Sequence, residues 1–267
     1  MNKNQTSRLR RWQHAAICLF AALIPLAPSV ASAADSEWRS LPLVTKGRVD
    51  PNWVFLGWGK FVVDDGVLRT DPDVKGLGLL VYQKEKLGNC QIRVVFKPKE
   101  AKSNSGVYVR IADGILGETN RPGAAFERDA NGTPPKESNE KMQASAEREE
   151  GPWFAVHQGY EAQIAGDSTG SIYSLANSSG TGTKAGEWRT MIITLAGTEI
   201  TVELDGKRVS SFDSANPDLP PRKQWYEPKR EAKRPEVGYL GLQTHDPGDV
   251  VWYKEISVRP LPASETK

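Results

Sequence analysis

Alternation of apolar and polar residues is the strongest pattern in the chain, and it predicts short β-strands along most of its length. The predicted strands are 77–82, 90–96, 104–111, 160–164, 171–173, 188–195, 237–243 and 250–258. Two further segments, 61–68 and 201–209, carry Asp-Gly at their centres, a pair that favours tight hairpin turns. Many strands and few amphipathic helical stretches predict an all-β fold, a sandwich of two antiparallel sheets.

Successive side chains of a strand point to opposite faces of a sheet, so the same alternation sorts residues into a core set and an outer set. In three segments the outer set is polar enough to suggest a binding surface. Its members are Asn104, Tyr108, Arg110, His157, Glu161, Gln163, Gln243 and His245. We therefore expect one acid, one base and one cation to share the polar face of a sheet.

Two stretches interrupt the strand pattern within a predicted single domain, residues 34–267. Residues 113–152 are rich in Gly, Pro and charge and include a predicted short helix, 138–150. They form either a solvated insertion or a lid or rim of a site, because long loops within domains are often functional. Residues 217–235 contain Trp225 and Tyr226 among Pro, Lys and Arg. This loop is either solvated or in contact with a ligand, since Trp225 could stack on a sugar ring.

The amino terminus has the pattern of a secretory signal peptide, which predicts export to the periplasm or outside the cell. Arg8, Arg10 and Arg11 precede an apolar run, 15–26, and a small-residue ending, Ala31-Ser-Ala33. The predicted signal peptide is residues 1–33, and the paired arginines leave general and twin-arginine export open. The apolar run is shorter than the roughly 20 residues of a membrane span, so no span is expected.

Removing the signal peptide changes both the charge and the cysteine count. It takes away four of the 35 basic residues and none of the 33 acidic ones, which leaves a net charge near −2. A nearly neutral exported protein has no electrostatic feature that favours nucleic acid as a partner. Cys90 is the only cysteine left, so an internal disulfide is excluded and the fold depends on its core.

Five segments in a fixed order resemble the 3-keto-disaccharide hydrolase family. They are Asn104–Arg110, His157–Ile164, Thr169–Tyr173, Gly186–Trp188 and Gly238–His245, the last followed by Val-Val-Trp-Tyr at 250–253. The resemblance extends over about residues 38–261. It implies a concanavalin A-like jelly roll whose ligand groove lies on the concave face of one sheet. The chain departs from the family where Arg189 follows Trp188, and where Asp167 stands two residues beyond the usual position of an acid.

The resemblance also implies a sugar that is already oxidised at C3. A ketone at C3 acidifies the hydrogen at C2, so a base can remove it and the glycosidic oxygen at C1 can leave by elimination. Water can then add back to complete a hydrolysis. This chemistry needs a base near C2, an electrophile for the enolate oxygen and an acid for the departing oxygen.

The predicted catalytic residues are His245, Glu161 and Arg110. His245 is predicted to transfer the proton because imidazole titrates near neutral pH. Glu161 could be the base instead, could orient His245, or could bind a cation. Arg110 could hold the enolate or a hydroxyl group. The structural alternatives are a histidine bonded at the sheet edge and an ion pair between Glu161 and Arg110.

The predicted substrate-binding residues have donors and acceptors that suit sugar hydroxyl groups, or rings that suit a sugar face. They are Asn104, Tyr108, Gln163, Gln243, His157 and Trp225. A divalent cation is a possible cofactor, bound by Glu161 and His245 with Gln163 or Asp167 as further ligands. The expected partner is an oligosaccharide or glycoside. The tryptophans in apolar or strand settings are expected in the core: Trp53, Trp58, Trp153, Trp188 and Trp252.

Two other functions are consistent with the same polar sheet face. A non-catalytic carbohydrate-binding module would need the groove but no base, because fold does not dictate activity. A conventional glycosidase would need two facing carboxylates about 5 Å or about 6.5–9.5 Å apart. Glu161 has no clear second carboxylate within the motif set, which favours the 3-keto-glycoside chemistry.

Overall fold

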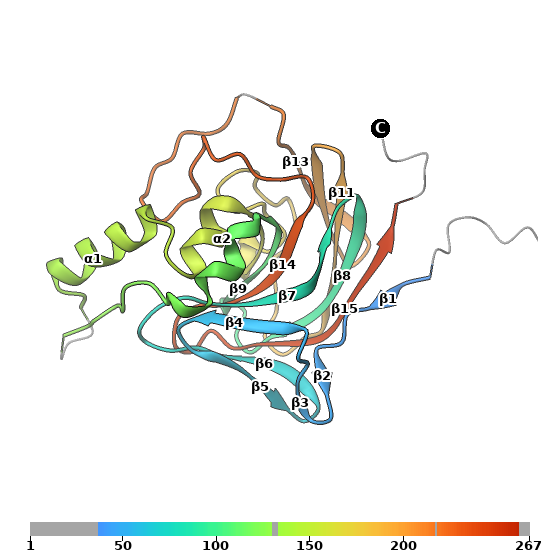
Figure 1. Ribbon diagram of the computed structural model, residues 1–267. Helices are drawn as coiled ribbons and strands as arrows, with labels where there is room; N and C mark the ends of the chain where they lie inside the picture. The colour runs from blue at the N-terminus through green and yellow to red at the C-terminus, as the bar shows by residue number, and fades with distance from the viewer. Residues whose placement is uncertain (1–36, 130–132, 217, 262–267) are drawn as a thin grey trace, which may run out of the picture. The chain divides into compact units, whose positions relative to one another are not determined.

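A computed structural model describes residues 37–129, 133–216 and 218–261, which fold as a β-sandwich (Figure 1). The larger sheet contains β1 (Arg39–Ser40), β5 (Lys60–Asp64), β6 (Val67–Asp71), β8 (Cys90–Pro98), β11 (Arg189–Ala196), β12 (Glu199–Leu204), β13 (Lys207–Asp213) and β15 (Val251–Pro260). The smaller sheet contains β4 (Trp53–Gly57), β7 (Gly78–Leu87), β9 (Asn104–Ile111), β10 (Tyr160–Ala165) and β14 (Gly238–Thr244). All these strands pair antiparallel, so the predicted two-sheet sandwich is confirmed.

The order of strands places the three polar segments on adjacent strands of the smaller sheet. The larger sheet runs β13-β12-β11-β8-β15-β6-β5, with β1 paired to β15, and the smaller sheet runs β10-β9-β14-β7-β4. A short separate hairpin joins β2 (Val44–Thr45) and β3 (Arg48–Val49). Because β9 lies between β10 and β14, three segments distant in sequence form one continuous half of the smaller sheet.

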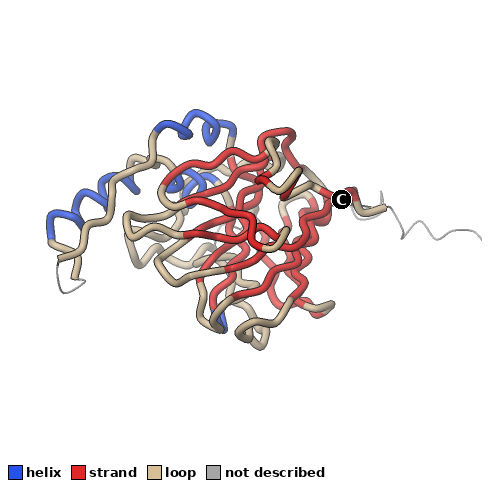
Figure 2. Tube along the Cα trace, turned by 90° about the horizontal axis from the view of Figure 1, so that it is seen from below, coloured by secondary structure: helices blue, strands red, loops and turns tan. Residues whose placement is uncertain are grey.

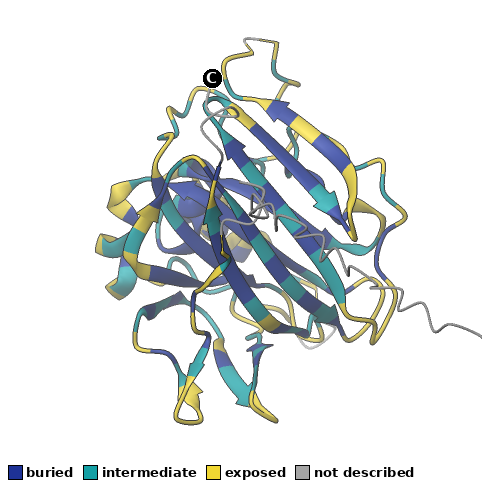
Figure 3. Ribbon diagram, turned by 90° about the vertical axis from the view of Figure 1, so that its right-hand side faces the viewer, coloured by how far each residue is buried: buried dark blue, intermediate teal, exposed yellow. Residues whose placement is uncertain are grey.

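The main core lies between the sheets and follows the predicted alternation. Along β8, Cys90, Ile92, Val94 and Phe96 are buried while the residues between them are less so. Figure 3 shows this alternation as bands along the strands of the larger sheet. On the other side, β10 directs apolar residues inward at every second position into the same cluster. The period of two in the sequence therefore builds this core.

The strand predictions include one segment that is not a strand, and they miss β4 and the two-residue strands β1, β2 and β3. Segment 171–173 forms only isolated bridges, from Ile172 to Ala162 and Ala176, and is not a strand. Strand β4 was not predicted, because its burial does not alternate. Of the tryptophans expected in the core, Trp53 and Trp153 are buried, but Trp188 is 39% exposed. Trp188 lies outside the sheet, where the ammonium group of Lys97 lies 4.9 Å from the centroid of its ring.

The insertion covers part of the outer face of the smaller sheet. It contains the 3-10 helix η1 (Asp113–Asn120) and α1 (Lys136–Glu147), and it leads into α2 (Pro152–Gln158). Figure 2 shows the longer helices outside the stacked strands. Met142 and Ala146 of α1 join Leu79 and Val81 of β7 in a second apolar cluster. The inner side of the insertion is therefore packed rather than solvated, and the predicted helix 138–150 corresponds to α1.

Loop 218–235 is attached to the insertion through α2 and the segment before it. The backbone N–H of Lys229 donates to Nδ1 of His157, 3.3 Å away, and its side chain pairs with Glu149 at 2.8 Å. His157 lies within α2 and is fully buried. Its expected position on a strand face is wrong, because the strand begins only at Tyr160, after α2 has ended. His157 therefore links a helix to a loop.

The predicted signal peptide, residues 1–33, lies outside the described residues, and export stays a prediction. Within residues 37–129, 133–216 and 218–261, no helix has both the length and the apolar composition needed to cross a membrane. A second η segment, η2 (Gly166–Ser168), follows β10 and carries the exposed Asp167.

His157 should make stability fall in acid. Burial, with the charges of Lys229 and Arg222, lowers the pKa of His157 to about 4. Between about pH 6.5 and 4 the unfolded chain binds a proton that the folded chain does not, so the free energy of unfolding decreases as pH falls through this window. His157→Asn keeps an acceptor for Lys229 and removes the titration.

Urea unfolding at pH 7 and pH 5 measures this effect. The loss of stability between the two pH values should be on the order of 1–2 kcal/mol larger in the wild type than in His157→Asn. Equal losses would show that His157 does not titrate as its burial requires.

Candidate active site

A cavity of about 460 Å³ opens on the polar half of the smaller sheet. Its floor consists of side chains from β9, β10 and β14, the three adjacent strands. The floor residues are Asn104, Tyr108, Glu161, Gln163, Gln243 and, just beyond β14, His245. The structure thus brings together six of the residues that strand parity placed on one polar face.

Cross-strand pairing fixes the centre of this floor. Glu161 of β10 lies directly opposite Tyr108 of β9. The Tyr108 hydroxyl donates to Glu161 Oε2 at 2.7 Å, and Gln243 Nε2 donates to the same hydroxyl at 3.2 Å. Each strand therefore contributes one member of a continuous hydrogen-bonded row.

Three side-chain oxygens of the floor are buried and have no hydrogen-bond donor among the described residues. They are Oε1 of Glu161, Oε1 of Gln163 and Oε1 of Gln243. The amide of Gln163 is held by donation from its Nε2 to Asn104 Oδ1, at 2.7 Å. Buried acceptors without donors are rare in folded proteins, so each of these oxygens requires a donor from outside the described residues, either water or a ligand. Hydroxyl groups of a sugar would meet this need.

The Glu161 carboxyl group is poised between its two protonation states near neutral pH. Burial raises the pKa of Glu161 to about 7, against the opposing effects of the Tyr108 hydrogen bond and the His245 charge. The carboxyl group also lies close over Gly106, where an added Cβ would be 2.1 Å from Oε1. Any larger residue at Gly106 would displace this oxygen.

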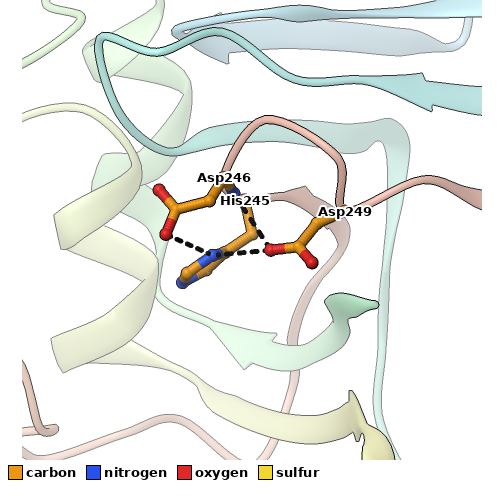
Figure 4. Close-up of side chains that lie close together, drawn as sticks. All are labelled: His245, Asp246 and Asp249. Atoms are coloured by element: carbon orange, nitrogen blue, oxygen red, sulfur yellow. Dashed lines mark hydrogen bonds and ion pairs between the residues drawn. The ribbon is translucent and has the colours of Figure 1, made fainter. Parts of the chain in front are cut away.

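His245 lies between two carboxylates, those of Asp246 and Asp249, as Figure 4 shows. Burial alone would lower the pKa of His245. The hydrogen bond to Asp249 and the charges of Asp246, Asp249 and Glu161 outweigh burial and raise it. Nδ1 of His245 lies 3.2 Å from Asp249 Oδ2 and 3.6 Å from a carboxylate oxygen of Asp246. The imidazole is therefore stabilised in its protonated form, with 28% of its side chain exposed.

A tight turn brings Asp249 back to His245. The backbone N–H of Asp249 donates to the carbonyl of Asp246 at 2.9 Å, and Gly248 has φ of +94° between them. These features describe a type II turn. The Asp249 carboxylate also accepts from the backbone N–H of Asn104 at 2.9 Å. Asp249 thus orients the imidazole and ties the end of β14 to the start of β9.

Two sets of residues could hold a cation. One ligand atom from each of His245, Asp246 and Asp249 lies within 4.8 Å of the others. In this set Asp249 already accepts from Asn104 and pairs with His245, which accounts for its position without an ion. The cation predicted at Glu161 and His245 stays a prediction, with both residues at the cavity. Asp167, a further predicted ligand, does not line it.

Arg110 does not reach the cavity, and its predicted place on the polar face is wrong. Two residues of β9, Val109 and Arg110, lie opposite the single residue Leu240 of β14, so β9 has a β-bulge here. Arg110 has φ of +53°. The bulge reverses the parity of the strand. Arg110 is 1% exposed, and its Nη2 donates at 2.6 Å to the carbonyl of Gly197, in the turn between β11 and β12 of the larger sheet. It crosses the sandwich, so the alternative ion pair with Glu161 is also wrong.

His157, the other displaced residue, is likewise outside the cavity, as its place in α2 requires. Trp225 does line the cavity, together with Tyr226 from the same loop and Met142 from α1. Sequence reasoning missed Asp246, Asp249 and Tyr173. The Pro-Gly pair at 247–248 predicts a turn, which could have indicated that Asp249 returns to His245. Tyr173 carries no comparable signal.

Residues 36–259 match a family described as a 3-keto-alpha-glucoside-1,2-lyase-like domain. Comparison with curated proteins finds no match. Among solved structures, a protein of Parabacteroides distasonis ATCC 8503, provisionally named a glycosyl hydrolase, is 24% identical with a TM-score of 0.55, covering 84% of this chain and 100% of that chain. A second protein of that organism with the same provisional name is 16% identical with a TM-score of 0.52, covering 84% and 94%.

A Bacillus subtilis protein of unknown function with a galectin-like fold is 12% identical with a TM-score of 0.50, covering 84% of this chain and 98% of that chain. These likenesses confirm the sandwich fold. The match over residues 36–259 spans both sheets and every residue of the cavity floor. The chain therefore belongs to the family of 3-keto-alpha-glucoside-1,2-lyase-like domains.

Proposed function

We propose that the protein cleaves the glycosidic bond of 3-keto-glycosides by elimination, followed by addition of water. The observation that carries this proposal is that Glu161 and His245 line one cavity. The pKa of Glu161 is raised to about 7, and the pKa of His245 is also raised. One group can take a proton near neutral pH while the other holds one. Family membership supports a carbohydrate-related role, and the two Parabacteroides distasonis neighbours bear the provisional name of glycosyl hydrolase.

Glu161 acts as the base in the first step. Its Oε1 is the buried, unpartnered oxygen, while Oε2 is occupied by Tyr108. Oε1 takes the proton from C2, and the electrons of that C–H bond form the C2–C3 double bond of an enolate. Negative charge moves to the oxygen on C3. A base with a pKa near the working pH suits this transfer.

His245 acts as the acid in the second step. The electrons of the enolate form a C1–C2 double bond, the ketone at C3 returns, and the C1–O bond breaks. The imidazolium of His245 donates its proton to the departing oxygen, which leaves as an alcohol. Asp249 is a positioning residue here, because its carboxylate holds Nδ1 of the ring at 3.2 Å and stabilises the charged form.

Neutral donors would stabilise the enolate oxygen, since Arg110 is directed elsewhere. The Asn104 amide and the Tyr173 hydroxyl both belong to residues that line the cavity. Burial, followed by the charge of Glu161, raises the pKa of Tyr173, so its hydroxyl stays protonated and able to donate. Donors placed before the reaction stabilise developing charge without having to reorganise.

Hydration reverses the proton transfers at the same residues. Water loses a proton to neutral His245 as its oxygen bonds to C1, and Glu161 returns to C2 a proton that has exchanged with solvent while the alcohol departs and water enters. The products are the alcohol and a free 3-keto sugar, and both catalytic groups regain their starting protonation. A non-catalytic carbohydrate-binding module would have the same floor but would not require these protonation states.

Turnover of phenyl 3-keto-α-glucoside against unoxidised phenyl α-glucoside tests the proposal. We expect cleavage of the keto form only, and Glu161→Gln should lower kcat/KM on it by about 10²–10⁴-fold, the usual contribution of a general base. The control is Glu203→Gln on β12 of the larger sheet, which should match the wild type. Sugar binding without cleavage in the wild type would identify a binding module instead.

The pH dependence of kcat/KM should be bell-shaped. Activity should rise with pH through about 7, because Glu161 must be ionised to act as the base. It should fall at higher pH as His245 loses the proton that it donates, above its ordinary value near 6.5. The two groups interact, so the limbs report the pair.

Asp249→Asn separates these limbs. The substitution removes one of the charges that raise the pKa of His245, so the alkaline limb should move to lower pH by more than the acid limb moves. Asp213→Asn on β13, an exposed site in the larger sheet, should leave both limbs in place. An alkaline limb unaffected by Asp249→Asn would contradict the role given to His245.

A further inference from the structure

The cavity has two chemically different sides. Its floor, on the smaller sheet, is polar and carries the three unpartnered oxygens of Glu161, Gln163 and Gln243. A second part of the lining, which we call the aromatic wall, is formed by the insertion, α2 and loop 218–235. Its members are Phe126, Met142, Trp153, Val156, Trp225 and Tyr226. A ligand that fits both sides must itself have a polar part and an apolar part.

Ring contacts within the wall hold Trp225 in place. Its ring centroid lies 5.5 Å from that of Trp153 and 5.4 Å from that of Tyr226, the latter nearly perpendicular at 80°. Trp153 is 8% exposed and anchors this set to the apolar cluster under the insertion. The wall is therefore built from rings that already support one another.

Ion pairs and hydrogen bonds attach the loop that carries Trp225 to the segments beneath it. Arg222 pairs with Glu147 at 2.9 Å and donates to the Trp225 carbonyl. Lys229 pairs with Glu149 at 2.8 Å. These contacts involve only residues of the chain, so the wall is supported by its own surroundings, and a preformed surface lowers the entropy cost of binding.

Half of the wall residues have no side-chain group that could donate a hydrogen bond to a second sugar. Phe126, Met142 and Val156 have no N–H or O–H in their side chains, and Met142 and Val156 are nearly fully buried at 5% and 6% exposure. The polar side chains on this side of the cavity, Asn139, Arg128 and Tyr226, are exposed. A second sugar ring would carry several hydroxyl groups, and burying them against this surface without partners would cost free energy.

We propose that the natural substrates carry an apolar aromatic aglycone, which packs against the aromatic wall while the 3-keto sugar binds the polar floor. This inference rests on the proposed function for the identity of the sugar. A cavity of about 460 Å³ falls in the range that holds whole small ligands, so both parts of an aryl glycoside have room. Trp225 determines specificity for the aglycone through ring contact, and it takes no part in proton transfer.

Binding of unoxidised glucosides tests this inference apart from catalysis. Calorimetry would compare phenyl α-glucoside, methyl α-glucoside and maltose, which share one sugar and differ in what is attached to it. The wild type should bind the phenyl compound roughly three- to tenfold more tightly than the other two, the size expected of one aromatic contact. Trp225→Ala should remove this difference in affinity and leave the affinity for methyl α-glucoside unchanged. Trp225→Phe should retain most of the preference for the phenyl compound.

Trp188→Ala is the matched control, because Trp188 is an exposed tryptophan next to β11 of the larger sheet and does not line the cavity. Equal affinities for the three glucosides, including no detectable binding of any, would overturn the inference. If Trp225→Ala weakened the affinities for the phenyl and methyl compounds equally, the inference would also be overturned, because Trp225 would then contact the sugar. If the protein preferred the phenyl compound but cleaved no 3-keto-glycoside, the proposed enzymatic function would be refuted and the inference about the aglycone would stand.

Discussion

Burial of one carboxyl group, that of Glu161, sets the requirements for the whole cavity. A buried carboxylate is costly unless partners stabilise it. Here one oxygen accepts from the Tyr108 hydroxyl, while the other has no donor in the part of the chain that the structure describes. Burial raises the pKa of Glu161 to about 7, and the single hydrogen bond from Tyr108 only partly opposes this rise. The position of the carboxyl group also explains Gly106, because any Cβ there would collide with the unpartnered oxygen. The site therefore keeps a group that a purely structural sheet would avoid.

The sandwich keeps this group in place by using its two faces differently. The inner face of the smaller sheet joins the main core and gives the strands a fixed register, so Glu161, Tyr108 and Gln243 meet without flexible loops. The outer face is divided: one half is polar, and the other half is covered by the insertion through Met142 and Ala146. The covering segments then supply the aromatic wall, so the same packing that shields the sheet also limits what can bind beside the sugar.

Strand parity predicted the core and most of the floor, because period-two burial needs only local sequence. Its failures have physical causes that the sequence does not display. A bulge with positive φ at Arg110 reverses the parity at the end of β9 and directs the guanidinium through the sandwich to Gly197. His157 was expected on a strand but ends a helix. Contacts across the fold, such as the approach of Trp225 to Trp153, depend on how the insertion folds and were beyond local reasoning.

The fate of the hydrogen at C2 tests the central claim most directly. The proposed elimination and hydration replace this hydrogen with one that has exchanged with solvent, whereas displacement at C1 would leave it untouched. Cleavage of phenyl 3-keto-α-glucoside in D₂O, followed by NMR from the first turnovers and corrected for exchange without enzyme, gives the answer. We predict deuterium at C2 of the released sugar at the rate of phenol release. Complete retention of the original hydrogen would contradict the account.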